Sequence, residues 1–71
     1  ERGHFAKAER LARQAIRTEP RTGRYHLLLG DSLRRQAEYA EARTEYETAR
    51  DLGHPSAEKR LRSLEALTQG G

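Results

Sequence analysis

The sequence predicts an all-α domain, and three of its features support this fold class. Nineteen of its 24 apolar residues are Ala or Leu and Val is absent, so the β-branched side chains that fill strands are scarce. Ala, Leu, Arg, Glu and Gln, which lose little side-chain freedom in a helix, make up most of the chain. Helix stop signals also divide it into segments of helical length. Its 71 residues allow one small domain, which excludes a multidomain enzyme within this chain.

Four helical segments are expected from the positions of these stop signals. The first break contains Pro20 and Gly23, and the third contains Gly53 and Pro55. The second break is a softer corner near residues 37–39, where neither Gly nor Pro occurs. The segments are short enough to pack as antiparallel neighbours, so we predict about four antiparallel helices.

Each segment has apolar residues at the helical period, which predicts one buried face per helix. In the first segment this face consists of Phe5, Ala8, Leu11, Ala12, Ala15 and Ile16. In the second segment it consists of Tyr25, His26, Leu29, Gly30, Leu33 and Ala37. The third segment has a similar face, formed by Tyr39, Ala42, Tyr46, Ala49 and Leu52. The fourth segment has a narrower stripe of Leu61, Leu64 and Leu67.

The chain also repeats itself at an offset of 34 residues. This shift places Phe5, Ala8, Ala12 and Ala15 on Tyr39, Ala42, Tyr46 and Ala49, respectively. A fixed offset of this kind indicates a repeat array, in which each unit buries its apolar face against its neighbours.

The second and third segments contain a recognisable repeat signature. The run from His26 to Leu33 corresponds to the pattern W-x2-L-G-x2-Y, with His26 at the Trp position and Leu33 at the Tyr position. Ala42 and Tyr46 then supply an A-x3-F element. The chain therefore resembles the tetratricopeptide repeat family, although Ala12 holds a position that is usually large and His54 holds the usual Pro position.

The resemblance implies a division of the chain into parts of three repeats. Residues 1–22 would be the second helix of a preceding repeat, and residues 23–56 one full repeat. Residues 57–71 would be the first or capping helix of the next repeat. Because the chain begins at Glu1 and its helical pattern starts almost at once, we expect it to be a piece of a longer protein. Twelve Arg against two Lys favour a GC-rich bacterial genome as its source.

The sequence offers no catalytic, metal or cofactor site. His4, His26 and His54 are too far apart for a helical ligand pair, and the absence of Cys removes disulfides and Cys-based zinc sites. We expect His26 to pack between helices as a small aromatic ring. There is also no nucleophile–base arrangement and no Gly-rich phosphate loop, so we predict neither enzymatic activity nor a bound cofactor. The longest apolar run is Leu27–Leu29, too short for a membrane span.

A candidate binding surface lies on the second segment, opposite its expected core face. It consists of Arg24, Leu27, Leu28, Asp31, Arg34 and Arg35. In the family that the chain resembles, first helices line a concave groove that takes peptides, and these six positions match that groove. The arginines would hold Asp or Glu and the leucines an aliphatic side chain, which favours an acidic and apolar peptide. Alternatively, Leu27 and Leu28 pack against adjacent repeats.

The predicted function is thus that of a non-catalytic module that binds a protein or peptide. Two alternatives remain: a basic helical nucleic-acid binder, favoured by the pI of 9.8, and an accessory interaction domain of a larger enzyme. The net charge of only +3 and the interleaved acidic residues argue against nucleic acid. Since about three repeats are needed for stability and this chain holds about two, we also expect self-association through exposed repeat ends.

Overall fold

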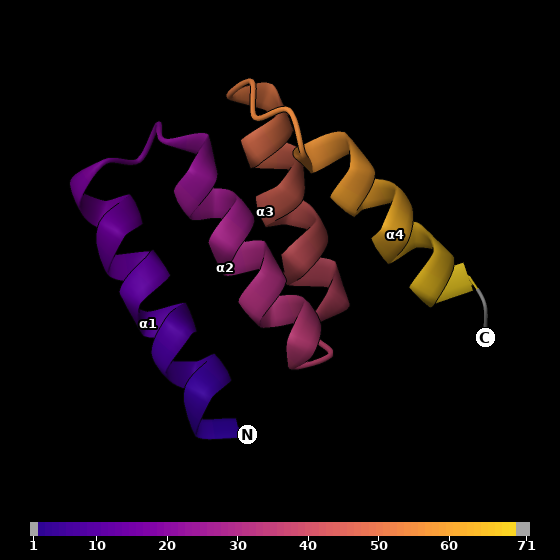
Figure 1. Cartoon of the computed structure of the whole chain (residues 1–71), viewed down its shortest axis with the longest axis horizontal. Helices are drawn as coiled ribbons and strands as arrows, with labels where there is room; N and C mark the ends of the chain where they lie inside the picture. The colour runs from indigo at the N-terminus through magenta and orange to yellow at the C-terminus, as the bar shows by residue number, and fades with distance from the viewer. Residues whose placement is uncertain (1, 70–71) are drawn as a thin grey trace.

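The computed structural model describes residues 2–69, which form four α-helices. Their bounds are α1 (Arg2–Thr18), α2 (Gly23–Arg35), α3 (Tyr39–Asp51) and α4 (Ala57–Gln69). Successive helices run in opposite directions (Figure 1). The described range contains no strand, and the three connections lie at the predicted breaks, so the all-α, four-helix prediction is confirmed.

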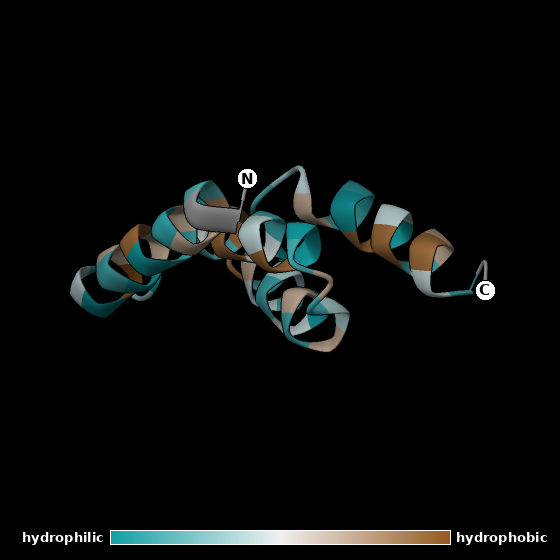
Figure 2. Cartoon of the chain, turned by 90° about the horizontal axis from the view of Figure 1, so that it is seen from below, coloured by the Kyte–Doolittle hydropathy of each residue, from teal (hydrophilic) through white to brown (hydrophobic). Residues whose placement is uncertain are grey.

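Each helix packs on the one that follows it in the chain. Figure 2 shows α2 and α3 together at the centre, with α1 on one side and α4 on the other. The result is a flat stack, with principal extents of 37 × 30 × 15 Å. Among the described helices, none is long and apolar enough to cross a membrane.

The core lies where α2 and α3 meet. The buried apolar residues are Ala12, Leu27, Leu29, Leu33, Ala42, Tyr46, Ala49, Ala57 and Leu64. The predicted core face of α3 is confirmed, since Ala42, Tyr46 and Ala49 have no exposed surface. The two helices approach each other closely at Gly30. A Cβ atom at this position would lie only 2.5 Å from Cε1 of Tyr46. Glycine therefore allows the ring to lie directly against the backbone of α2.

The connection between α2 and α3 ends α2 without a glycine. Ala37 adopts a left-handed conformation with φ of 63°, as Gly53 does after α3 with φ of 91°. The amide of Glu38 donates to the carbonyl oxygen of Leu33 at 2.9 Å, and the amide of Ala37 donates to that of Arg34 at 3.0 Å. These two bonds satisfy carbonyl groups that the helix end would otherwise leave unpaired.

Three of the predicted buried faces are wrong in part. In α1, Ala12 is buried, but Ala8 is exposed and Leu11 retains 57% of its surface. The apolar arc of α1 is wider than the surface that α2 covers, so one side of it stays open. Ala37, expected on the core face of α2, is exposed in the turn, and Leu67 near the end of α4 is 53% exposed.

Candidate functional site

The open side of α1 and the neighbouring surface of α2 form a groove of about 560 Å³. From α1 the groove is lined by His4, Phe5, Ala8, Leu11, Ala12 and Ala15. From α2 it is lined by Tyr25, Leu28, Asp31, Ser32 and Arg35. Leu11 and Leu28, which are 57% and 49% exposed, give the groove an accessible apolar wall on each helix. A concave, mostly apolar surface with a few polar groups is the usual form of a binding site.

Arginines stand at both ends of the α2 wall. Arg24 lies in the first turn of α2, with its guanidinium carbon 5.5 Å from the centre of the Tyr25 ring. Arg35 is the last residue of α2, with its guanidinium carbon 5.7 Å from the centre of the Phe5 ring on α1. At these distances the cation is attracted to the face of the ring, which restrains both side chains. The apolar groove is thus bounded by two positive charges.

The position of α1 is fixed by a polar network that links it to α2 and α3. Arg13 donates to Glu9 at 2.9 Å and to Glu41 of α3 at 2.7 Å. Gln36, just after α2, donates to the other oxygen of Glu9 at 2.9 Å. The hydrogen bond from Gln36, followed by that from Arg13, lowers the pKa of Glu9. These contacts therefore help to set the width of the groove.

Asp31, one of the predicted binding residues, is engaged inside the molecule. Its carboxylate accepts a hydrogen bond from the Tyr46 hydroxyl at 2.5 Å, and it accepts two from Arg60 of α4, at 3.0 and 3.3 Å. Burial raises the pKa of Tyr46 well above its ordinary value, and the bond to Asp31 raises it further. Asp31 thus joins α2, α3 and α4.

The other predicted residues are divided between the two sides of α2. Leu28 and Arg35 line the groove, and Arg24 is exposed, with its guanidinium over the ring of Tyr25, which also lines the groove. Leu27, by contrast, is only 6% exposed and belongs to the core. Arg34 is half-buried, and its Nε atom has no hydrogen-bond partner within residues 2–69. The structure therefore does not bring the six residues together on one open face.

His26 has a more specific role than the sequence indicates. The residue is 8% exposed, with Nδ1 of its ring 2.8 Å from a carboxylate oxygen of Glu45 and Nε2 2.7 Å from the carbonyl oxygen of Pro20. The ring thereby ties the connection before α2 to α3. These hydrogen bonds depend on the packing of three segments, so periodicity alone does not reveal them. In the described part of the chain, His, Asp and Glu do not gather into a group of three or more that could hold a metal ion.

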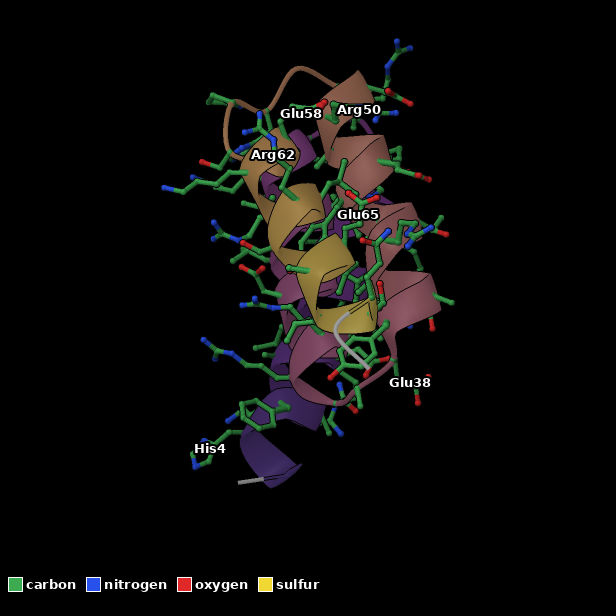
Figure 3. All side chains as sticks on the ribbon, turned by 90° about the vertical axis from the view of Figure 1, so that its right-hand side faces the viewer. His4, Glu38, Arg50, Glu58, Arg62 and Glu65 are labelled. Carbon is green, nitrogen blue, oxygen red and sulfur yellow. The ribbon has the colours of Figure 1, made fainter. Side chains whose placement is uncertain are left out.

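A second, charged hollow of about 340 Å³ lies between α3 and α4. It is lined by Arg43, Glu47 and Arg50 of α3 and by Glu58, Leu61, Arg62 and Glu65 of α4. Figure 3 shows four of these side chains along the two helices, Arg50 on α3 and Glu58, Arg62 and Glu65 on α4. The i, i+4, i+7 spacing of alternating charges on each helix is a sequence signal that the prediction missed. With one apolar side chain among its walls, this hollow is less suited to hold a peptide than the groove.

Comparisons with known proteins indicate the family to which the chain is similar. The sequence model described as tetratricopeptide repeat matches residues 1–57, most of the chain. No curated protein matches the chain, and no solved structure does.

Proposed function

The chain belongs to the tetratricopeptide repeat family, whose members are generally protein–protein interaction modules and typically non-catalytic, and on this premise we propose that it binds a protein segment along the groove between α1 and α2. The observation that carries the proposal is the pair of exposed leucines, Leu11 and Leu28, between arginines at both ends of α2. Exposed apolar side chains grouped in one hollow are characteristic of interaction surfaces.

The proposed ligand is a segment with a central aliphatic side chain and acidic side chains on either side. Leu28 and Leu11 would bury the aliphatic group, and Arg24 and Arg35 would bind the carboxylates. These arginines are 11 residues apart on one helix, which corresponds to about 16 Å. An extended peptide spans that length with about five residues. The matching probe is a peptide with a leucine at its centre and a glutamate near each end.

The remaining predicted residues have a supporting role in this proposal. Leu27 and Asp31 hold α2 against its neighbours, through the core and through Arg60 respectively. Arg34 is half-buried and does not line the groove. Because the groove is one repeat wide, the association is expected to be in the micromolar range.

Two variants of α2 test this proposal with the glutamate–leucine probe. Leu28→Ser removes an apolar contact, so it should weaken binding about tenfold at both low and high salt. Arg35→Glu reverses a charge, so it should weaken binding strongly at low salt and much less at high salt. Isothermal titration calorimetry at two ionic strengths measures both effects.

Matched controls are available on α4. Leu67 is as exposed as Leu28 (53% against 49%) but lies outside the groove, so Leu67→Ser should not weaken probe binding. Arg62→Glu provides the corresponding charge control. Circular dichroism establishes that each variant is folded. If Leu28→Ser and Arg35→Glu fold and bind the probe as the unmodified chain does, the proposal is wrong.

A further inference from the structure

The internal repeat relates the open side of α1 to the face of α3 that α2 covers. The α3 residues Ala42 and Ala49 are completely buried, because α2 covers this face of α3. Their counterparts 34 residues earlier are Ala8 and Ala15 of α1, of which Ala8 is exposed and Ala15 half-buried. The place that α2 occupies on α3 is therefore open on α1 around Ala8 and Ala15, whereas Ala12, the counterpart of Tyr46, is already buried.

The other end of the stack has the complementary open face. The first residues of α2 and α4, Gly23 and Ala57, are also 34 residues apart, so α4 corresponds to α2. Leu33 of α2 is 2% exposed, whereas its counterpart on α4, Leu67, is 53% exposed. On α2 this side is covered by α3. The corresponding side of α4 is open near the C-terminal end of α4.

We propose that α4 of one copy of this chain packs into the α1–α2 groove of a second copy, in the position that α2 has on α3. The proposal uses the same groove as the proposed function, and the two ligands would compete for it. In the α2–α3 pair, Leu33 at the end of α2 lies close in sequence to Tyr39 at the start of α3. By the same register, Leu67 would lie near Phe5, the counterpart of Tyr39, on the second copy.

The distribution of exposed apolar residues supports this occupant. In the part of the chain that the structure describes, the large apolar side chains with extensive exposure are Leu11, Leu28 and Leu67. Two of them line the groove and the third is on α4, so one contact between copies covers all three. The contact joins two different surfaces, and it therefore leaves a free groove and a free α4 at the ends of every assembly.

Salt separates this association from the binding of an acidic peptide. Both α1 and α4 carry a net positive charge, so their mutual repulsion opposes association at low ionic strength. Added salt screens the repulsion and should strengthen the association between copies. The attraction between an acidic peptide and the arginines of the groove should instead weaken.

The test uses one variant of each surface. Leu11→Glu blocks the groove and leaves α4 intact, whereas Leu67→Glu blocks α4 and leaves the groove intact. Both residues are more than half exposed, so both variants should fold. Sedimentation velocity from micromolar to millimolar concentration should show that the unmodified chain grows beyond a dimer. Each variant alone should associate at least about tenfold more weakly.

An equimolar mixture of the two variants is the decisive sample. The intact α4 of Leu11→Glu fits the intact groove of Leu67→Glu, so the mixture should form dimers and nothing larger. A mixture that stays monomeric, an unmodified chain that stays monomeric at millimolar concentration, or unchanged association of Leu67→Glu would overturn the proposal. Leu67→Glu should still bind the glutamate–leucine probe, so failure of peptide binding and failure of self-association are measured separately.

Discussion

At the scale of single residues, the contact between Gly30 and Tyr46 determines how closely α2 and α3 approach. A Cβ atom at Gly30 would lie 2.5 Å from one ring carbon of Tyr46 and 2.7 Å from another, and Tyr46 has no exposed surface into which to move. Gly30→Ala should therefore cost about 1–3 kcal/mol through overpacking, even though alanine is the better helix former. Urea denaturation measures the change.

Gly23 provides the control for this substitution. A Cβ atom there would lie 3.3 Å from the carbonyl oxygen of Ala49 and from Cβ of His54, so these neighbours would need to move by only a few tenths of an ångström. Gly23→Ala should change stability by less than half as much as Gly30→Ala. Equal effects of the two substitutions would show that the ring of Tyr46 does not restrict α2.

Ala37 has a backbone conformation that is unfavourable for a residue with a side chain. Its φ of 63° lies in the left-handed region, where an L-residue with a Cβ atom is strained and glycine is not. Ala37→Gly should stabilise the chain by about 0.5–1 kcal/mol, which corresponds to a rise in Tm of a few degrees. Ala40→Gly, at an exposed position within α3, should destabilise it by a similar amount. Two shifts in Tm of the same sign would contradict the argument.

At the scale of the helices, one carboxylate links three of the four elements. Asp31 of α2 accepts hydrogen bonds from Tyr46 of α3 and Arg60 of α4. Tyr46→Phe removes the first of these bonds and should cost about 0.5–1.5 kcal/mol at neutral pH. The loss is limited because Arg60 still pairs with Asp31.

The same hydroxyl group makes stability depend on alkaline pH. Burial raises the pKa of Tyr46 in the folded chain, whereas in the unfolded chain the hydroxyl ionises near its ordinary value of 10.0. The unfolded state therefore loses the proton first, so the stability that this group contributes is complete below pH 10 and decreases as the pH rises above it. In denaturant titrations from pH 8 upward, the free energy of unfolding of Tyr46→Phe should decrease less steeply with pH than that of the unmodified chain. Tyr39→Phe is the control, and parallel curves for the two variants would contradict the assignment.

At the scale of the whole molecule, the pattern of apolar residues predicts the arrangement of helices better than it predicts their surfaces. It identified the residues at the centre of the α2–α3 contact, such as Leu29, Leu33 and Tyr46, because each of these two helices covers the other there. It failed for Leu11, since periodicity gives the width of an arc but not the width that a neighbour covers. Leu27 and Leu28 are adjacent in sequence, yet one is buried and the other half exposed.

The candidate site was predictable only in part for the same physical reason. Leu28 and Arg35 were found from their pattern on one helix, whereas the α1 wall of the groove exists only once two helices are placed side by side. The Asp31–Arg60 pair spans 29 residues of sequence, and no local pattern signals it. The division of the chain into residues 1–22, 23–56 and 57–71 as parts of three repeats stays a prediction.

Acidic as well as basic residues occur on each of the four helices. α1 has one acidic residue against five basic ones, α3 has four against two, and the net charge of the chain is +3. A protein that neutralises many phosphates loses affinity steeply as salt increases, and this arrangement offers few such contacts. Fluorescence anisotropy with duplex DNA should therefore show only weak binding at physiological salt. Tight binding that falls steeply with salt would favour the nucleic-acid alternative.

The most direct test of the central claim is a two-dimensional NMR titration of the ¹⁵N-labelled chain with the glutamate–leucine probe. A ligand in the groove between α1 and α2 should shift the amide signals of Leu11, Tyr25, Leu28 and Arg35. Signals from the charged hollow, such as those of Glu47 and Arg62, should stay in place. If the shifts gather in that hollow, or if no signal moves at millimolar probe, the groove is not the binding surface of this protein.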